Sequence, residues 1–251
     1  MRKQNKVLVI GEVCTDIFRY GITSRKSPEG NGPVFLPIDE LKVWGKGMAG
    51  NTAANLEAMG LVVDTYFDKG MITKTRYVNR DTNELYLRVD ENDTTDRIDI
   101  YNLPDFLQYD AIIISDYCKG FLTEEDINNI ASMHHLVIID TKKKLGNWCK
   151  NLAFIKLNRF EAQNNHDIIL EEKWLQDKII TTLDGKGAAF KGKIYSTQKV
   201  ENADVSGAGD TFVAGFVAKY LESEDVGVSI NWANYCAREV VKQRGVSVFK
   251  K

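Results

Sequence analysis

Five short apolar runs, rich in β-branched residues, recur along this chain and limit the folds that it can adopt. They are VLVIG (7–11), AIIISD (111–116), LVIID (136–140), AFIKLN (153–158) and KIITTL (178–183). A run that is apolar on both faces suits a parallel strand covered by helices on both sides. Helix-like segments lie between several of these runs, so the pattern predicts an α/β fold with a doubly wound, mostly parallel sheet flanked by helices.

Polar residues follow the apolar runs at the point where each predicted strand ends. Examples are Glu12, Asp116, Asp140 and Asn158. Doubly wound sheets bind ligands beyond the C-terminal ends of their strands. The sequence therefore predicts a ligand site at that edge.

Helix signals are clearest in the second half of the chain. Thr123 and Asp126 predict an acidic capping box at the start of a helix over 123–133. Apolar residues at helical spacing predict two further helices, over 211–221 and about 227–243.

Two segments depart from the strand–helix rhythm. Residues 17–43 hold three of the four prolines, and residues 74–90 alternate around a turn at Asp81-Thr82-Asn83, which is typical of a hairpin. Together they predict a small antiparallel β-sheet that serves as a lid over a ligand cleft. We find no linker composition and expect a single domain over 1–251 that carries this lid.

The bulk properties indicate small-molecule partners. A net charge of −2 argues against a general nucleic-acid binder. No apolar stretch approaches the roughly 20 residues of a membrane span, and the apolar run near the N-terminus is too short for a signal peptide, so we expect a cytoplasmic location. The scattered cysteines predict free thiols, and the histidines (His134, His135 and His166) have no ligand-like neighbours and are expected at the surface.

The stretch ADVSGAGDTFVAGF (203–216) holds the strongest chemical signal. Small residues at 206–209 allow a sharp turn, so that backbone N–H groups converge at a helix N-terminus and can bind a phosphate. Asp210 would then lie beside that phosphate, where it could accept a proton from an attacking hydroxyl. The alternative is a tight turn followed by an ordinary N-terminal helix acid.

DVSGAGDTFVAGF resembles the D-T-x-G-A-G-D-x-F signature of the ribokinase-like (PfkB) carbohydrate kinases. Gly47-Met48-Ala49-Gly50-Asn51 resembles the Gly-rich signature nearer the N-terminus of that family, and Asn158-Arg159-Phe160-Glu161 resembles its N-x-x-E motif. YGITSRKSPEGNGPV, ISDYCKGFLT, the 73–93 stretch and VIIDTKKK resemble, more narrowly, the D-glycero-D-manno-heptose-7-phosphate kinases, which form half of the bifunctional ADP-heptose synthesis proteins. The resemblance covers nearly the whole chain.

The resemblance implies a ribokinase-like fold and a role for each matching residue. Asp210 would be the catalytic base, and Gly207, Ala208 and Gly209 would form the anion hole for the transferred phosphoryl group. Asn158 and Glu161 would position Mg²⁺, although a helix N-cap with its first-turn acid has the same spacing. The implied ATP-binding residues are Thr182, Gly185, Gly187 and Asn234, where a hairpin turn would also explain the glycines.

On the acceptor side, the resemblance assigns sugar hydroxyls to Asp16 and Asn51, with Gly47 in the same Gly-rich stretch. Asp16 could instead cap a turn after the first strand, and the glycines could simply let a helix begin. A heptose phosphate would also need cations. The candidates, any of which could be an ordinary surface charge, are Arg25, Lys74, Arg76, Arg88 and Lys119.

The implied function is ATP- and Mg²⁺-dependent phosphorylation of a sugar hydroxyl, most specifically the anomeric hydroxyl of a heptose 7-phosphate. The alternatives are a kinase for another sugar or a nucleoside, and a non-catalytic sugar or nucleotide sensor. The sensor remains open because only residues 61–72 stand where the family has a longer strand–helix unit. Val34, Phe35 and Leu36 in the lid suggest a homodimer.

Overall fold

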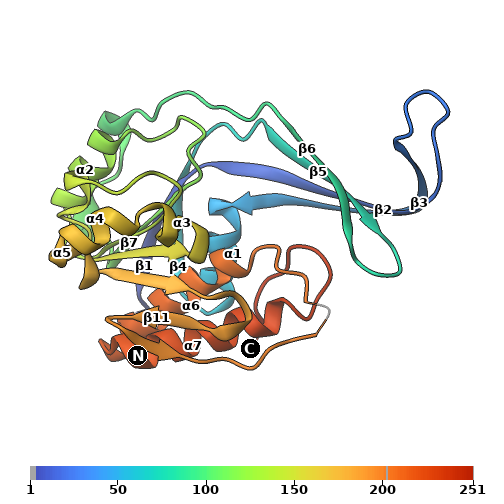
Figure 1. Ribbon diagram of the computed structural model, residues 1–251. Coiled ribbons are helices and arrows are strands. Elements are labelled where there is room, and N and C mark those ends of the chain that lie inside the picture. Colours follow the sequence, from blue (N-terminus) through green and yellow to red (C-terminus); the bar gives the residue numbers. More distant parts are fainter. Residues whose placement is uncertain (1–3, 202, 251) are drawn as a thin grey trace.

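The computed structural model describes residues 4–201 and 203–250, with the side chains of residues 39 and 40 outside that description. Its larger sheet has eight strands in the order β12-β11-β10-β9-β8-β7-β1-β4, and its smaller sheet has four. Figure 1 shows the smaller sheet projecting from one side of the layered body. The neighbouring pairs from β10 to β4 are parallel and those of β11 are antiparallel, which confirms the predicted mostly parallel α/β sheet.

The five predicted strands all form, with ends within two residues of the sequence prediction. The strands of the larger sheet are β1 (Lys6–Gly11), β4 (Val62–Phe67), β7 (Ala111–Asp116), β8 (Val137–Thr141), β9 (Phe154–Asn158), β10 (Ile179–Thr182), β11 (Ala188–Phe190) and β12 (Lys193–Tyr195). The α-helices are α1 (Ala49–Ala58), α2 (Glu124–Ser132), α3 (Arg159–Asn164), α4 (His166–Glu171), α5 (Lys173–Gln176), α6 (Ala208–Ser223) and α7 (Val226–Val240). The predicted capping box at Thr123 and Asp126 is present at the start of α2.

Alternating side chains along the central strands build two separate cores. In β1, Val7 and Val9 join a core with α1, α6 and α7, whereas Leu8 and Ile10 join a core with α2 and the short helices α3 to α5. Both faces of the sheet are therefore covered, as the continuous apolar runs require. The helices of the first core bring the N-termini of α1 and α6 to the C-terminal edge of β1 (Figure 1).

The predicted lid segments lie in the smaller sheet, in which the two outer strand pairs are antiparallel as predicted and the central pair is not. It consists of β2 (Val13–Lys26), β3 (Pro33–Met48), β5 (Ile72–Asn79) and β6 (Leu85–Glu91), in the order β3-β2-β5-β6. The central pair β2 and β5 is parallel. The reason is that β2 continues from β1 and β5 continues from β4, and β1 and β4 are themselves parallel neighbours.

The short segment at 61–72 supplies the edge strand β4 and then enters β5 directly. Asp68 braces this crossing, because its Oδ1 accepts a hydrogen bond of 2.7 Å from the backbone N–H of Val13 at the start of β2. The two crossings from the larger to the smaller sheet are thereby tied to each other.

His134 corrects the expectation of a surface residue. It is only 8% exposed, with Nε2 lying 3.1 Å from the carbonyl oxygen of Tyr109 and Nδ1 lying 3.2 Å from the N–H of Leu136. The ring thus satisfies backbone groups at the start of β8, a role that its sequence neighbours do not reveal. His135 and His166 are exposed, and the four cysteines are free.

None of the helices within the described ranges is long and apolar enough to span a bilayer.

Gly11→Ala should lower the free energy of unfolding by about 1–3 kcal/mol, because overpacking costs that much in a dense core. A Cβ at this position would run into the carbonyl oxygen of Ser115 in β7. Urea unfolding measures the change. Gly30→Ala is the matched control, since a Cβ there meets nothing within 4 Å. Equal stability of the two variants would contradict this packing.

Candidate active site

Asp210 lies at the centre of a pocket between the two sheets. It occupies the first turn of α6 and is 5% exposed. Its Oδ1 accepts a hydrogen bond of 2.7 Å from the hydroxyl of Tyr117, and its Oδ2 accepts one of 3.1 Å from Nδ2 of Asn51. Burial raises the pKa of Asp210 to about 6, against the opposing effect of these two hydrogen bonds. A carboxylate with this pKa can act as a base near neutral pH.

Asn51 is held in the orientation that suits a neighbour of this base. Its Oδ1 accepts a hydrogen bond of 3.2 Å from Nδ2 of Asn55, one turn later in α1. Asn55 in turn accepts a hydrogen bond of 2.9 Å from the N–H of Phe249 near the C-terminus. The amide group of Asn51 therefore points toward Asp210 and the carbonyl of Gly207.

The loop before α6 has the geometry of an anion site. Gly207 has φ +77°, and a Cβ on it would run into the side-chain nitrogen of Asn51. Within the described part of the chain, the backbone N–H groups of Gly207, Gly209 and Asp210 have no protein acceptor, whereas that of Ala208 reaches the carbonyl of Val205 at 3.2 Å. Free N–H groups at the start of a 16-residue helix favour a bound anion.

Lys156 adds a cation next to this loop, although none of the sequence motifs pointed to it. Its Nζ lies 2.9 Å from Oδ2 of Asp140 in a pair whose side chains are each 7% exposed. A Cβ on Gly209 would lie 3.1 Å from the same Nζ, so the ammonium packs against the anion loop. A lysine inside the apolar run AFIKLN was the signal that could have revealed it.

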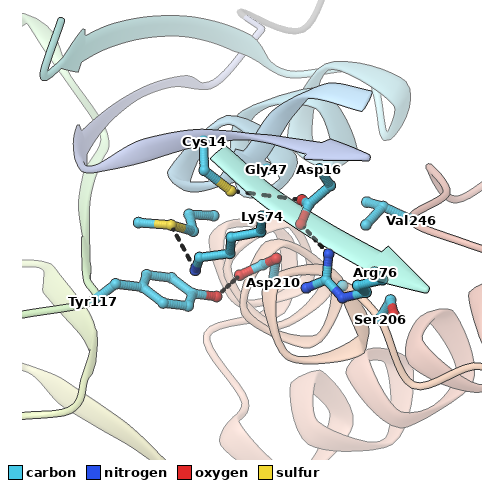
Figure 2. Close-up of a pocket in the computed structure, with 11 residues that line it drawn as sticks. Cys14, Asp16, Gly47, Lys74, Arg76, Tyr117, Ser206, Asp210 and Val246 are labelled. Carbon is cyan, nitrogen blue, oxygen red and sulfur yellow. Dashed lines mark hydrogen bonds and ion pairs between the residues drawn. The ribbon is translucent and has the colours of Figure 1, made fainter. Parts of the chain in front are cut away.

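The inner face of the smaller sheet forms the opposite wall of the pocket. Asp16 on β2 and Lys74 and Arg76 on β5 line it, and Asp16 forms an ion pair with Arg76 (Figure 2). Gly47 lies against the Asp16 carboxylate and the Cys14 thiol, so closely that no Cβ would fit. The structure thus places six of the predicted site residues around one pocket. They are Asp16, Gly47, Lys74 and Arg76 on one side and Gly207 and Asp210 on the other.

Tyr117 joins the two sides of the pocket. Its hydroxyl is hydrogen-bonded to Asp210, and its ring makes two cation–π contacts. Nζ of Lys74 and Nζ of Lys142 each lie 5.2 Å from the ring centroid. Burial raises the pKa of Tyr117 well above its usual value, so the hydroxyl remains a donor to Asp210. The buried Glu12 anchors this loop by accepting hydrogen bonds from the N–H groups of Tyr117 and Lys119, at 2.8 and 2.9 Å.

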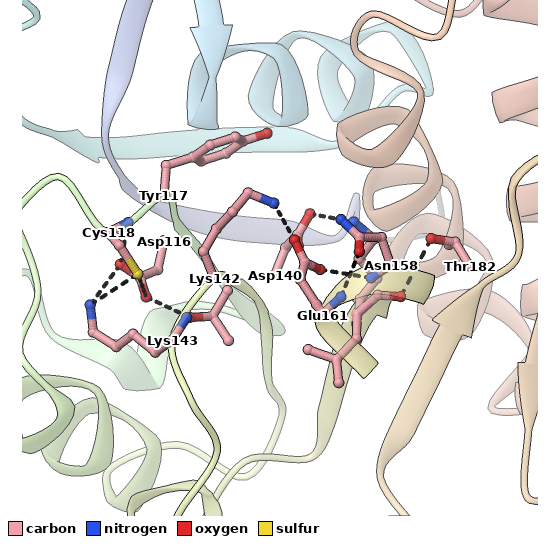
Figure 3. Close-up of polar contacts among 12 residues, drawn as sticks. Asp116, Tyr117, Cys118, Asp140, Lys142, Lys143, Asn158, Glu161 and Thr182 are labelled. Atoms are coloured by element: carbon pink, nitrogen blue, oxygen red, sulfur yellow. Dashed lines mark hydrogen bonds and ion pairs between the residues drawn. The ribbon is translucent and has the colours of Figure 1, made fainter. Parts of the chain in front are cut away.

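Asn158 and Glu161, the predicted magnesium residues, form a capping box at the start of α3. Glu161 also forms an ion pair with Lys142, as Figure 3 shows. Each side-chain oxygen retains a second lone pair, and Mg²⁺ usually keeps several waters. The pair therefore fits a metal held through water. Within the described residues, no cluster of three or more acidic, His or Cys side chains forms a direct metal cage.

The remaining predicted cations lie outside the pocket lining. Arg25 is exposed near the far end of β2, Arg88 pairs with Asp90 on β6, and Lys119 pairs with Asp93. These three cations therefore do not line the pocket that holds Asp16, Lys74 and Arg76.

The predicted nucleotide residues lie in the part of the larger sheet from β10 to β12 and on the neighbouring helix α7. Thr182 ends β10, Gly185 lies in the short 3₁₀ turn Asp184–Lys186, and Gly187 has φ +98° beside β11. Asn234 on α7 donates a hydrogen bond of 2.8 Å to the carbonyl of Tyr195, which ends β12. These residues therefore border the region between β10, β12 and α7.

Comparison with known proteins gives a consistent family. Residues 45–250 match the model of the pfkB family carbohydrate kinases. The bifunctional protein HldE of Helicobacter pylori strain J99 is 30% identical over 96% of this chain, and the chain spans 63% of that protein's length. Thermotoga maritima ribokinase has a TM-score of 0.75 at 15% identity, with 97% of this chain and 95% of that chain covered. A Vibrio cholerae fructokinase, solved with fructose, ADP and potassium ion, has a TM-score of 0.66 at 15% identity, with 97% and 94% covered.

The value of kcat/KM should decrease as the pH is lowered through about 6. Asp210 accepts a proton only when it is ionised, and its pKa is raised to about 6. Tyr117→Phe removes a hydrogen bond that lowers this pKa, so the decrease should move to higher pH. A pH–rate profile measures both. Tyr101→Phe, at a side chain that is 93% exposed, should leave the profile unchanged. An unchanged pH–rate profile in Tyr117→Phe would contradict the hydrogen bond between Tyr117 and Asp210.

Proposed function

Because the chain belongs to the pfkB family of carbohydrate kinases, we propose that it transfers the terminal phosphoryl group of ATP to a sugar hydroxyl, with Asp210 as the base. The single observation that carries this proposal is the buried Asp210 carboxylate next to free backbone N–H groups at the start of α6. That arrangement suits phosphoryl transfer, which needs alignment and charge stabilisation more than covalent help.

In the proposed reaction, Asp210 accepts the proton of the attacking hydroxyl while the free N–H groups of the loop stabilise charge on the transferred group. Lys156 adds positive charge beside the same loop. Asn51 and Tyr117 hold the carboxylate in place through one hydrogen bond to each oxygen. Asn158 and Glu161 would hold Mg²⁺ through water, and the ion would neutralise part of the charge on the ATP phosphates. Thr182, Gly185, Gly187 and Asn234 would contact the nucleotide.

For the acceptor we propose the anomeric hydroxyl of a heptose 7-phosphate. Support comes from the similarity to HldE and from Lys74, which is 7% exposed and lines the pocket. Within the described residues, Lys74 has no carboxylate within ion-pair distance, so an anionic group of the acceptor would supply one. Asp16 and Asn51 would bind sugar hydroxyls, and Arg76 would contribute a second cation.

Asp210→Asn should lower kcat by about 10²- to 10⁴-fold, because an amide cannot accept the proton. Nucleotide binding should persist. ADP release over a panel of sugars, sugar phosphates and nucleosides measures turnover and also separates a heptose phosphate kinase from a kinase for another acceptor. Asp177→Asn, at an exposed surface pair, is the matched control. Near-normal turnover in Asp210→Asn would refute the base, and nucleotide binding without turnover in the natural chain would favour a sensor.

The outward face of the smaller sheet supports a homodimer. In the strand register, Val43 on β3 is in line with Val89 on β6, and Leu41 is in line with Leu87. Residues in one such row point to the same side of a sheet. These four side chains are 37–58% exposed, and the next rows, which hold Asp16, Lys74 and Arg76, face the pocket. Of the lid residues named from the sequence, only Leu36 is exposed, whereas Val34 and Phe35 are half-buried.

Replacing Val43 and Leu87 together with lysine should convert the dimer to a monomer, because charges would have to be buried against an apolar face. Light scattering coupled to size-exclusion chromatography measures the mass. Tyr101→Lys, at an exposed position away from this sheet, should keep the mass of the natural chain. A natural chain that is monomeric at all concentrations would exclude the homodimer.

A further inference from the structure

Met48 has a backbone conformation that side chains rarely adopt. It ends β3 and precedes α1 with φ 58° and ψ −127°, and it is 4% exposed. Only glycine enters this region without strain. Strain of this kind persists where the surroundings hold the residue in place, and it is concentrated at ligand sites.

The side chain of Met48 meets the buried ammonium of Lys74. Its sulfur lies 3.1 Å from Nζ of Lys74, and the same Nζ lies 5.2 Å from the ring centroid of Tyr117. A thioether is only a weak acceptor, so this contact holds the ammonium without neutralising its charge. Figure 2 shows the side chain of Lys74 ending near Tyr117 and Asp210.

Met48 also gives the pocket an apolar floor. Together with Cys14 and Ile72 it forms a small buried cluster, and Tyr117 packs against that cluster. The ion pair of Asp16 and Arg76 adjoins this cluster, because Sγ of Cys14 lies 3.6 Å from Oδ2 of Asp16. A ligand that packs on the side chains of Met48 and Cys14 gains most by presenting C–H groups to them, because their sulfur atoms offer a hydroxyl only weak hydrogen-bond partners in place of water.

We infer that Met48 is a specificity-determining residue for the acceptor. Its side chain limits the depth of the pocket and directs Lys74 at the ligand, so that the site selects a sugar phosphate whose C–H surface faces the floor. This inference rests on the proposed kinase function, and it explains why a strained residue occupies a position where glycine would fit without strain.

The test compares Met48→Ala, Met48→Gly and Met48→Leu with the natural chain. The acceptors are glucose 6-phosphate, mannose 6-phosphate, sedoheptulose 7-phosphate, D-glycero-D-manno-heptose 7-phosphate and their unphosphorylated counterparts. In the Ala and Gly variants, the ratio of kcat/KM between the best phosphorylated acceptor and its unphosphorylated counterpart should fall at least about tenfold, which corresponds to about 1.4 kcal/mol. Met48→Leu keeps the bulk and should preserve the order of acceptors. Met71→Ala, at a methionine that is 69% exposed, should match the natural chain.

The melting temperatures provide a second readout that does not depend on turnover. At most positions a variant with glycine is less stable than the variant with alanine. Here Met48→Gly should melt about 2–4 °C above Met48→Ala, because both variants lose the same side chain and only glycine relieves the strain.

The possible failures can be told apart. If the natural chain phosphorylates no acceptor, the proposed function fails, and this inference fails with it. If the natural chain is active but Met48→Ala keeps the acceptor ratio, or Met48→Gly melts below Met48→Ala, the inference about Met48 is wrong while the kinase proposal stands.

Discussion

The pocket depends on the burial of one carboxylate at the start of a helix. Asp210 is removed from water, which raises its pKa to about 6, and each of its oxygens accepts one hydrogen bond. One donor, Asn51, comes from α1, and the other, Tyr117, comes from the loop after β7. Because α1 follows β3 of the smaller sheet and Tyr117 follows β7 of the larger sheet, the position of the base depends on both sheets. A displacement of either element would leave a buried charge with too few partners, which is costly.

The same dependence extends to the acceptor side through strand register. β2 and β5 continue from the C-terminal edge of the larger sheet, where β1 and β4 are paired in parallel. Asp16 and Lys74 are direct partners in that continuation, so their separation is fixed by backbone hydrogen bonds and not by flexible loops. The side proposed for the phosphate donor is fixed in a similar way, because Asp140 on β8 and Lys156 on β9 are partners in the strand register. Both sides of the proposed reaction are therefore positioned by strands, which gives the precision that catalysis requires.

The sequence predicted those parts that follow from local pattern. Buried parallel strands are recognisable because they are apolar on both faces, and the loop before α6 is recognisable because small residues precede an acid. Tyr117 and Lys156 were missed as site residues because their importance lies in contacts with Asp210 and Gly209, far away in the sequence. The parallel pairing of β2 with β5 was missed for a similar reason. It follows from the pairing of β1 with β4, and the segment 61–72 is too short for its sequence pattern to predict the edge strand β4.

Local rules are broken most clearly around Asp210. Met48 has a strained backbone, Lys74 is a buried ammonium without an acidic partner among the described residues, and Oδ1 of the buried Asp140 accepts no hydrogen bond from them. Each feature lowers stability by itself, and the three surround Asp210 from different strands. The two apolar cores above and below the sheet stabilise the chain enough to tolerate them. An anionic ligand that enters between Lys74 and the loop before α6 would accept hydrogen bonds from the Lys74 ammonium and from the free N–H groups of the loop, so these donors should be better satisfied in the bound state than in the free one.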